Sequence, residues 1–127
     1  MTKRVLDVGN CVPDHAAVRR LVESNFDAEV SQSHQLRDTL AALRKERFDL
    51  VIVNRKLDHD YSDGLEIIRK IKADPELRQV PAIMLSNYPE YQKEAIEAGA
   101  EMGFGKQEYG KPATLEQLGK FLGDEPS

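Results

Sequence analysis

Phe48-Asp49-Leu50-Val51-Ile52-Val53-Asn54 decides the fold of this chain. The residues from Leu50 to Val53 are apolar without the alternation of a half-exposed strand. This pattern predicts a strand covered on both faces, as in a parallel sheet. Asn54 is the first residue past the carboxyl end of that strand. Ligand and reaction sites of open parallel sheets form at these ends, so the sequence predicts that Asn54 belongs to any site of the chain.

The segments around this strand alternate between strand and helix patterns. Short apolar segments predict further strands at residues 5–8, 28–30, 80–85 and 102–104. A helix with one apolar face follows each strand, and Pro13, Pro89 and Pro112 mark the first turns of three of these helices. Ser33 is expected to cap the second helix. Because parallel strands need crossover helices, five strands alternating with five helices predict an α/β, doubly wound domain.

The predicted domain spans residues 1–123, and the polar residues 124–127 are expected to form a tail. A chain of 127 residues is long enough to bury one core. Its single cysteine, Cys11, excludes an internal disulfide and is typical of a reducing compartment. The formal net charge of -4 argues against a nucleic-acid partner, and no apolar run is long enough to span a membrane. A cytoplasmic location is therefore expected.

Three segments carry a resemblance to a known family. They are Asp63-Gly64-Leu65-Glu66, Val80-Pro81-Ala82-Ile83-Met84-Leu85-Ser86, and Gly99-Ala100 with Lys106 seven residues after Gly99. In this order and spacing they resemble the receiver domains of two-component response regulators, over nearly the whole chain. The resemblance implies the chemotaxis-regulator fold, a flavodoxin-like parallel sheet with strand order 2-1-3-4-5 and five helices.

The resemblance also implies a phosphorylation pocket, from which this chain departs. Receiver domains carry a phosphoacceptor aspartate after the third strand, a Ser or Thr after the fourth and a Lys after the fifth. Ser86 and Lys106 match the last two, but Asn54 stands at the phosphoacceptor position. The pair of acids that binds Mg²⁺ after the first strand falls on Gly9-Asn10, or on Asn10-Cys11 if an extra residue lies upstream.

The other positions that the resemblance implies differ as well. The aromatic switch position, three residues before the lysine, is Gly103, with Phe104 beside it. Gln107 replaces the proline that customarily follows the lysine.

The missing acids change the expected chemistry. Phosphoryl transfer to this fold needs an anionic carboxylate as nucleophile, and Mg²⁺ needs carboxylate oxygens to hold it. With Gly9, Asn10 and Asn54 in their place, we expect no catalytic residue, no metal in this pocket and no cofactor. Asn54 is nearly isosteric with aspartate and is interpreted as a structural polar group.

Lys106 then needs another partner, because an uncompensated charge near a core is costly. Asp7, Asp58 or Asp60 could provide it. Asp7 lies inside a strand that packs on both faces, so it must be paired or hydrogen-bonded. The sequence leaves two interpretations of Asp7 open: a salt bridge with Lys106, or a residual ion site.

Two further clusters contain residue types that can carry chemistry. Cys11 precedes a helix N-terminus with Asp14 and His15 in the first turn, which permits a redox or metal role but favours an unreactive thiol. The segment Asp58-His59-Asp60 resembles a cation-binding patch, and a solvated acidic loop is the favoured interpretation.

Aromatic residues gather near the fourth helix and the fifth strand, where the resemblance implies an output surface. They are Tyr88, Tyr91, Phe104 and Tyr109. Aromatic side chains suit protein contacts, although Phe104 is the one most expected to belong to the core.

The leading hypothesis is a phosphorylation-independent receiver-like module that binds a protein partner: a signalling kinase, an output domain or a second copy of the chain. It is expected not to be an enzyme. Three alternatives remain open: phosphorylation at a displaced acid, Asp58 or Asp60; a redox sensor centred on Cys11; and an anion site made by Lys106, Ser86 and the helix N-terminus after Asn10.

Overall fold

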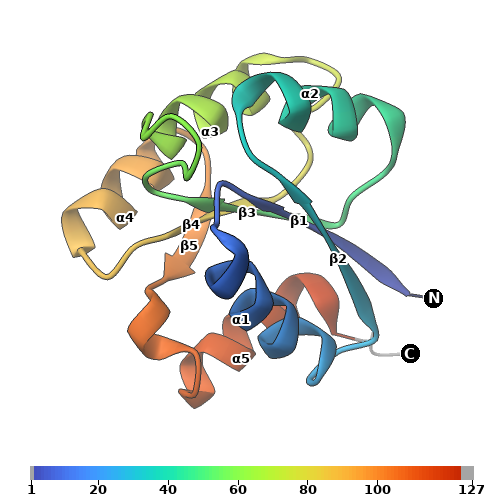
Figure 1. Cartoon of the computed structure of the whole chain (residues 1–127), viewed down its shortest axis with the longest axis vertical. Helices are drawn as coiled ribbons and strands as arrows, with labels where there is room; N and C mark the ends of the chain where they lie inside the picture. Colours follow the sequence, from blue (N-terminus) through green and yellow to red (C-terminus); the bar gives the residue numbers. More distant parts are fainter. Residues whose placement is uncertain (1, 124–127) are drawn as a thin grey trace.

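The run that ends at Asn54 forms β3 (Leu50–Asn54), the central strand of a parallel sheet in the computed structural model, which describes residues 2–123 (Figure 1). The other strands are β1 (Lys3–Val8), β2 (Ala28–Ser33), β4 (Ala82–Leu85) and β5 (Glu101–Phe104). Their order is β2-β1-β3-β4-β5, and each neighbouring pair is parallel. The predicted fold class is confirmed. The predicted tail, 124–127, lies outside the described residues.

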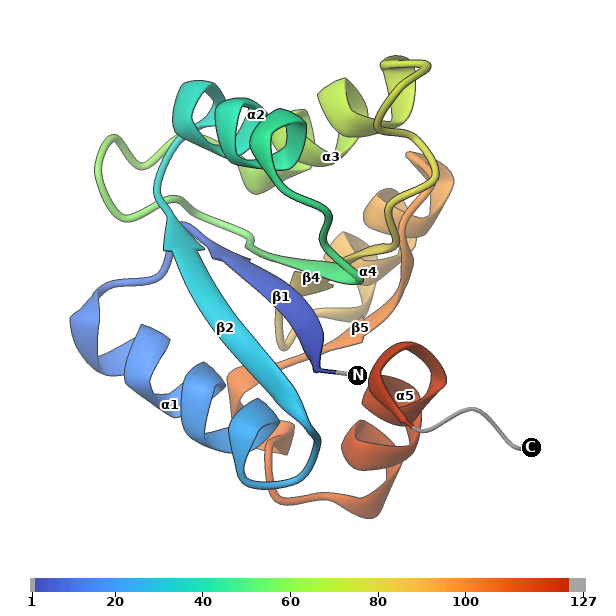
Figure 2. The same cartoon turned by 90° about the vertical axis from the view of Figure 1, so that its right-hand side faces the viewer.

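Five helices cover the two faces of the sheet. They are α1 (Val12–Glu23), α2 (Leu36–Lys45), α3 (Gly64–Ala73), α4 (Pro89–Glu97) and α5 (Pro112–Leu122), with a short 3₁₀ turn η1 (Lys106–Glu108). Helices α1 and α5 lie on one face, and α2, α3 and α4 lie on the other (Figure 2). None of the described helices has the length and apolar character needed to cross a bilayer.

The burial of β3 explains its uninterrupted apolar run. Val51 and Val53 pack among α2, α3 and α4, whereas Leu50 and Ile52 pack among α1 and α5. All four side chains are fully buried. Because each face of the strand has its own core, neither face needs polar residues.

Several strand boundaries differ from the sequence prediction: β1 begins at Lys3, β5 begins at Glu101, and β3 includes Asn54 as its last residue. β2 continues to Ser33, whose hydroxyl is buried against the Thr39 hydroxyl at 2.8 Å, so Ser33 does not cap α2. The backbone amides of His34 and Gln35 donate instead to the carboxylate of Asp38 in the first turn of α2. β4 begins at Ala82 rather than residue 80, because Val80 N closes a turn onto Leu77 O.

Candidate functional site

The carboxyl ends of four strands meet at one edge of the sheet and form the candidate site. Asn54 is paired in register with Leu85, and Leu85 with Phe104, so Ser86 and the start of η1 lie at the same edge as Asn54. The amide of Asn54 also reaches the end of β1. The fold therefore brings together Gly9, Asn54, Ser86 and Lys106, the residues that the sequence singled out.

Asn54 is held by its amide nitrogen. Nδ2 donates to the carbonyl oxygen of Lys56 at 2.7 Å and to that of Gly9 at 3.2 Å. A carboxylate has no hydrogen to donate when it is ionised, so these two carbonyls would oppose it. The pocket is built around an amide at this position.

Gly9 stands at the first position of the family's acid pair in one of the two placements that the sequence left open, and its backbone explains why it carries no side chain. Its φ of 80° lies in the left-handed region, and a Cβ there would lie 2.4 Å from Leu57 Cδ2 and 3.2 Å from Leu57 Cα. An L-residue would be strained and would overlap the loop after β3. An acidic side chain at this position is therefore disfavoured by the backbone itself.

Lys106 extends toward α1 and forms an ion pair with Asp14, at 2.7 Å between Nζ and Oδ2. The prediction that Asp7, Asp58 or Asp60 supplies this partner is wrong. Asp14 lies in the first turn of α1, which brings its carboxylate within reach of the end of β5. The hydrogen bond from Lys106 keeps the pKa of Asp14 below its usual range.

A hollow of about 320 Å³ lies beside Asn54 at this edge. Its lining includes three cationic side chains, Arg55, Lys56 and Lys106, together with Ser86, and none of the described residues that line it carries a carboxylate. Lys106 is paired with Asp14, and Arg55 lies 3.8 Å from Asp63. Both acids lie outside the lining, so they offset part of a positive charge that still favours an anion over a divalent cation. The anion site remains a prediction that this charge supports.

Asp7 is completely buried on β1 and is hydrogen-bonded on both oxygens. Asn10 Nδ2 donates to Oδ1 at 2.5 Å, and His15 Nδ1 lies 2.7 Å from Oδ2. Burial raises the pKa of Asp7 above its usual value, although His15, Asn10 and the more distant charge of Lys106 oppose the shift. Asp7 forms no salt bridge with Lys106; its partners are His15 and Asn10.

Two polar atoms near Asp7 have no hydrogen-bond partner among the described residues. They are Asn10 Oδ1 and Tyr109 Oη. Burial raises the pKa of Tyr109, and the negative charges of Asp7 and Asp14 raise it further. Tyr109 therefore stays neutral in this environment.

The raised pKa of Asp7 makes stability depend on pH with a definite sign. The folded chain holds the proton more tightly than the unfolded chain, so the free energy of unfolding falls as pH rises from about 3.8 through the folded pKa. We expect Asp7→Asn to gain stability relative to the natural chain over that interval, by about 1.4 kcal/mol for each unit of the shift. Urea unfolding at several pH values measures the difference.

Asp14→Asn is the matched control for this titration. The pKa of Asp14 is lowered, so its stabilising pair with Lys106 is present above pH 3.8 and is lost as pH falls through the folded value. At neutral pH, the free energy of unfolding should therefore be higher in Asp7→Asn and lower in Asp14→Asn than in the natural chain. In acid, both variants should approach the natural value. Equal deviations of the same sign would contradict the assignment.

The side chains around Cys11 are arranged differently from a reactive thiol site. Cys11 is exposed at the N-cap of α1. His15 faces Asp7 instead. The imidazole that could activate the thiol is thus engaged elsewhere.

The loop acids are engaged in contacts of their own. Asp58 lies beside His34 Nδ1, at 3.1 Å from Oδ2, and near His59. Asp60 accepts hydrogen bonds from the backbone and the hydroxyl of Ser62. The sequence did not link His34 to this loop, because 24 residues separate it from Asp58.

The predicted aromatic face is only partly exposed. Tyr88 is 59% exposed at the N-cap of α4. Tyr91 is half-buried with the guanidinium of Arg55 4.1 Å from its ring centre, and Tyr109 packs edge-on against the buried ring of Phe104. Of the four predicted residues, Tyr88 is the one that presents its ring to solvent.

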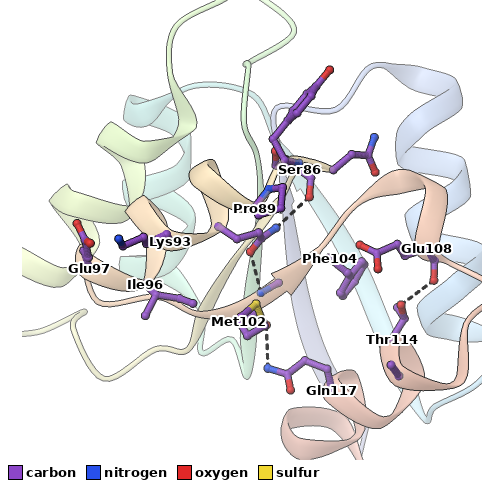
Figure 3. A pocket seen from close by; sticks show the side chains of 15 residues that line it. Ser86, Pro89, Lys93, Ile96, Glu97, Met102, Phe104, Glu108, Thr114 and Gln117 are labelled. Carbon is purple, nitrogen blue, oxygen red and sulfur yellow. Dashed lines mark hydrogen bonds between the residues drawn. The ribbon is translucent and has the colours of Figure 1, made fainter.

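A groove of about 780 Å³ lies between α4, β5 and α5 and is lined by Tyr88 but not by Tyr91 or Tyr109. Figure 3 shows Ile96 of α4 and Met102 of β5 on the same side of this groove. Their exposed fractions are 40% and 52%. The sequence interpretation missed both residues, because an apolar residue on a helix or strand is usually assigned to the core.

Gly103 leaves the aromatic switch position without a side chain. The pairing of β4 and β5 shifts register between Ile83 and Leu85, and a Cβ on Gly103 would lie 2.1 Å from Met84 O. Gln92 fills the adjacent space: its side chain accepts from Gly103 N and donates to Met84 O and Ser86 O. A side chain at position 103 is excluded by this packing.

Comparisons with known proteins agree with this architecture. A family model described as response regulator receiver domain matches residues 10–118. The comparison with curated proteins found no match.

Solved structures of response regulators are similar to this chain. A putative response regulator from Chloroflexus aurantiacus J-10-fl has a TM-score of 0.82 and 16% identity, over 98% of this chain and 100% of its own. A response regulator from Thermotoga maritima has a TM-score of 0.78 and 23% identity, over 98% of this chain and 100% of its own. The chemotaxis response regulator CheY4 of Vibrio cholerae has a TM-score of 0.74 and 23% identity, over 96% of this chain and 100% of its own. At these identities, the likeness shows a shared fold.

Proposed function

Because the chain belongs to the response regulator receiver domain family, we propose that it acts in signal transduction as a protein-interaction module that does not depend on phosphorylation. The proposed domain ends at residue 123, just past α5. Its activity is recognition of a protein partner, and no catalytic step is assigned to it.

One observation carries the proposal: Asn54 donates two hydrogen bonds from the position where the family has its phosphoacceptor. An amide has no anionic oxygen to attack phosphorus. The surroundings agree, because Gly9 cannot carry an acid without strain and the nearby hollow is lined by Arg55, Lys56 and Lys106. Mg²⁺ would meet positive charge there instead of the carboxylates it requires.

The test is intact-mass spectrometry after incubation with acetyl phosphate and Mg²⁺, with a receiver domain that has all its acids as positive control. We expect no phosphoryl adduct on this chain. A stoichiometric adduct would contradict the proposal, and peptide mapping would locate it. An adduct on Asp58 or Asp60 would support the displaced-acid alternative.

The surface proposed for partner contact is the groove between α4, β5 and α5. Tyr88, Ile96 and Met102 give it exposed apolar area, and Lys93, Glu97 and Glu108 surround them with charge. An apolar centre with a polar rim is typical of protein interfaces. A signalling kinase, an output domain or a second copy of the chain could occupy it.

A further inference from the structure

Two segments from different parts of the chain bring three metal-binding side chains together. His34 follows β2, whereas Asp58 and His59 lie in the loop between β3 and α3. His34 Nδ1 lies 3.1 Å and His59 Nε2 3.7 Å from Asp58 Oδ2. One ligand atom from each residue lies within 4.8 Å of those of the other two.

We propose that His34, Asp58 and His59 bind a divalent transition-metal ion of the zinc class. Two imidazole nitrogens and one carboxylate oxygen are ligands that Zn²⁺ accepts, with water completing a tetrahedral site. Mg²⁺ prefers oxygen ligands throughout. This site is separate from the acid pocket that the receiver family uses for Mg²⁺.

The spacing of the ligand atoms fits such an ion. A tetrahedral zinc site with bonds of about 2.0–2.2 Å places its ligand atoms roughly 3.3–3.6 Å from one another. The two contacts to Asp58 Oδ2, 3.1 and 3.7 Å, lie on either side of this interval. The two imidazole rings would have to turn out of their parallel stack to bring both nitrogens onto one ion, because a bound metal lies in the plane of each ring.

The two imidazole rings are stacked, with centroids 4.0 Å apart and planes within 4°. Both rings direct a nitrogen toward the same carboxylate. One carboxylate is thus shared by both imidazoles.

The site is supported by backbone contacts and remains open to solvent. His34 N donates to Asp38 at 2.9 Å, and Asp58 N donates to the carbonyl oxygen of Gly9 at 3.0 Å. The Asp58 side chain is 16% exposed and that of His59 is 52% exposed, so His59 provides an entry path for the ion. Metal sites that keep a bound water commonly have ligand residues held in place by further hydrogen bonds and one side that faces solvent.

Calorimetric titration of the full chain with zinc chloride tests the proposal. We expect one ion per chain, and a loss of affinity greater than roughly 100-fold in His34→Ala and in His59→Ala, since losing even an outer contact of a metal site costs ~10–100-fold. Magnesium chloride in excess should neither bind at this site nor compete. Unfolding curves without metal check that each variant is folded.

Asp58→Asn and Asp60→Asn form the matched pair for this test. Each removes one negative charge from the same loop, but only Asp58 belongs to the proposed site. We expect Asp58→Asn to weaken zinc binding strongly and Asp60→Asn to leave it nearly unchanged. Equal losses of zinc affinity in the two variants would mean that the loop attracts the ion only through its net charge, and would overturn the proposal. Zinc binding that persists without His34 and His59 would overturn it as well.

Proton NMR of the natural chain provides a test that needs no variant. The chain has three histidines, so the ring signals can be assigned. Stoichiometric zinc should shift the ring signals of His34 and His59 and leave those of His15 in place. A response confined to His15, or no response at all, would overturn the assignment.

Discussion

Asn54→Asp is expected to lower the free energy of unfolding at neutral pH by about 1–3 kcal/mol and to gain no phosphoryl adduct. The change replaces a donor of two hydrogen bonds by a carboxylate that faces the carbonyl oxygens of Gly9 and Lys56. Lys106 cannot fully compensate it, because its ammonium is paired with Asp14. An aspartate at position 54 alone is therefore not expected to make the chain accept a phosphoryl group.

Asn54→Ala separates repulsion from simple loss of hydrogen bonds. It removes the same two donors but adds no charge, so it should be less destabilising than Asn54→Asp at pH 7. The difference in stability between the two variants should narrow in acid, where the introduced carboxyl is protonated and can donate again. Urea unfolding at pH 7 and pH 4 measures this difference. Mass spectrometry with acetyl phosphate and Mg²⁺ measures the adduct, and phosphorylation of Asn54→Asp would show that the amide alone had blocked the chemistry.

Gly64→Ala is expected to lower the free energy of unfolding by about 3 kcal/mol or more, because α3 begins in direct contact with the backbone of β3. A Cβ on Gly64 would lie 2.1 Å from Asn54 O and 2.8 Å from Val53 Cγ1. The first contact is with backbone, which cannot rotate away, so the helix and the strand would have to separate. The midpoint of urea unfolding should fall accordingly.

Gly110→Ala is the control for Gly64→Ala. A Cβ on Gly110 would meet nothing within 4 Å. The same substitution there should be neutral or should stabilise the chain by up to about 1 kcal/mol, through a less flexible unfolded state. Similar losses at both positions would contradict the steric explanation.

The sequence predicted the sheet and the identity of the residues at its edge, because those features depend on local pattern. The apolar run of β3 required two covered faces, and its end placed Asn54 at the site. Contacts between distant segments were different. The pairing of Lys106 with Asp14 depends on how α1 is rotated against the sheet, and nothing in the spacing of 92 residues encodes that rotation.

The exposed apolar residues of the groove between α4, β5 and α5 are only partly indicated by the sequence. Tyr91 and Ala95 are four residues apart and mark the inward side of α4. Ile96, one position later, lies toward the edge of that side, which agrees with its partial exposure. The approach of His34 to Asp58 had no comparable signal, because it depends on the path of a loop.

Gly103 has a consequence for how binding would be controlled. Position 103 has no side chain that could change its rotamer beside the groove, and Gln92 and the backbone of Met84 occupy the adjacent space. On the proposed function, the groove offers one shape at all times. Occupancy by a partner would then follow how much of the protein the cell makes, and synthesis or turnover, instead of a chemical mark, would carry the regulatory information.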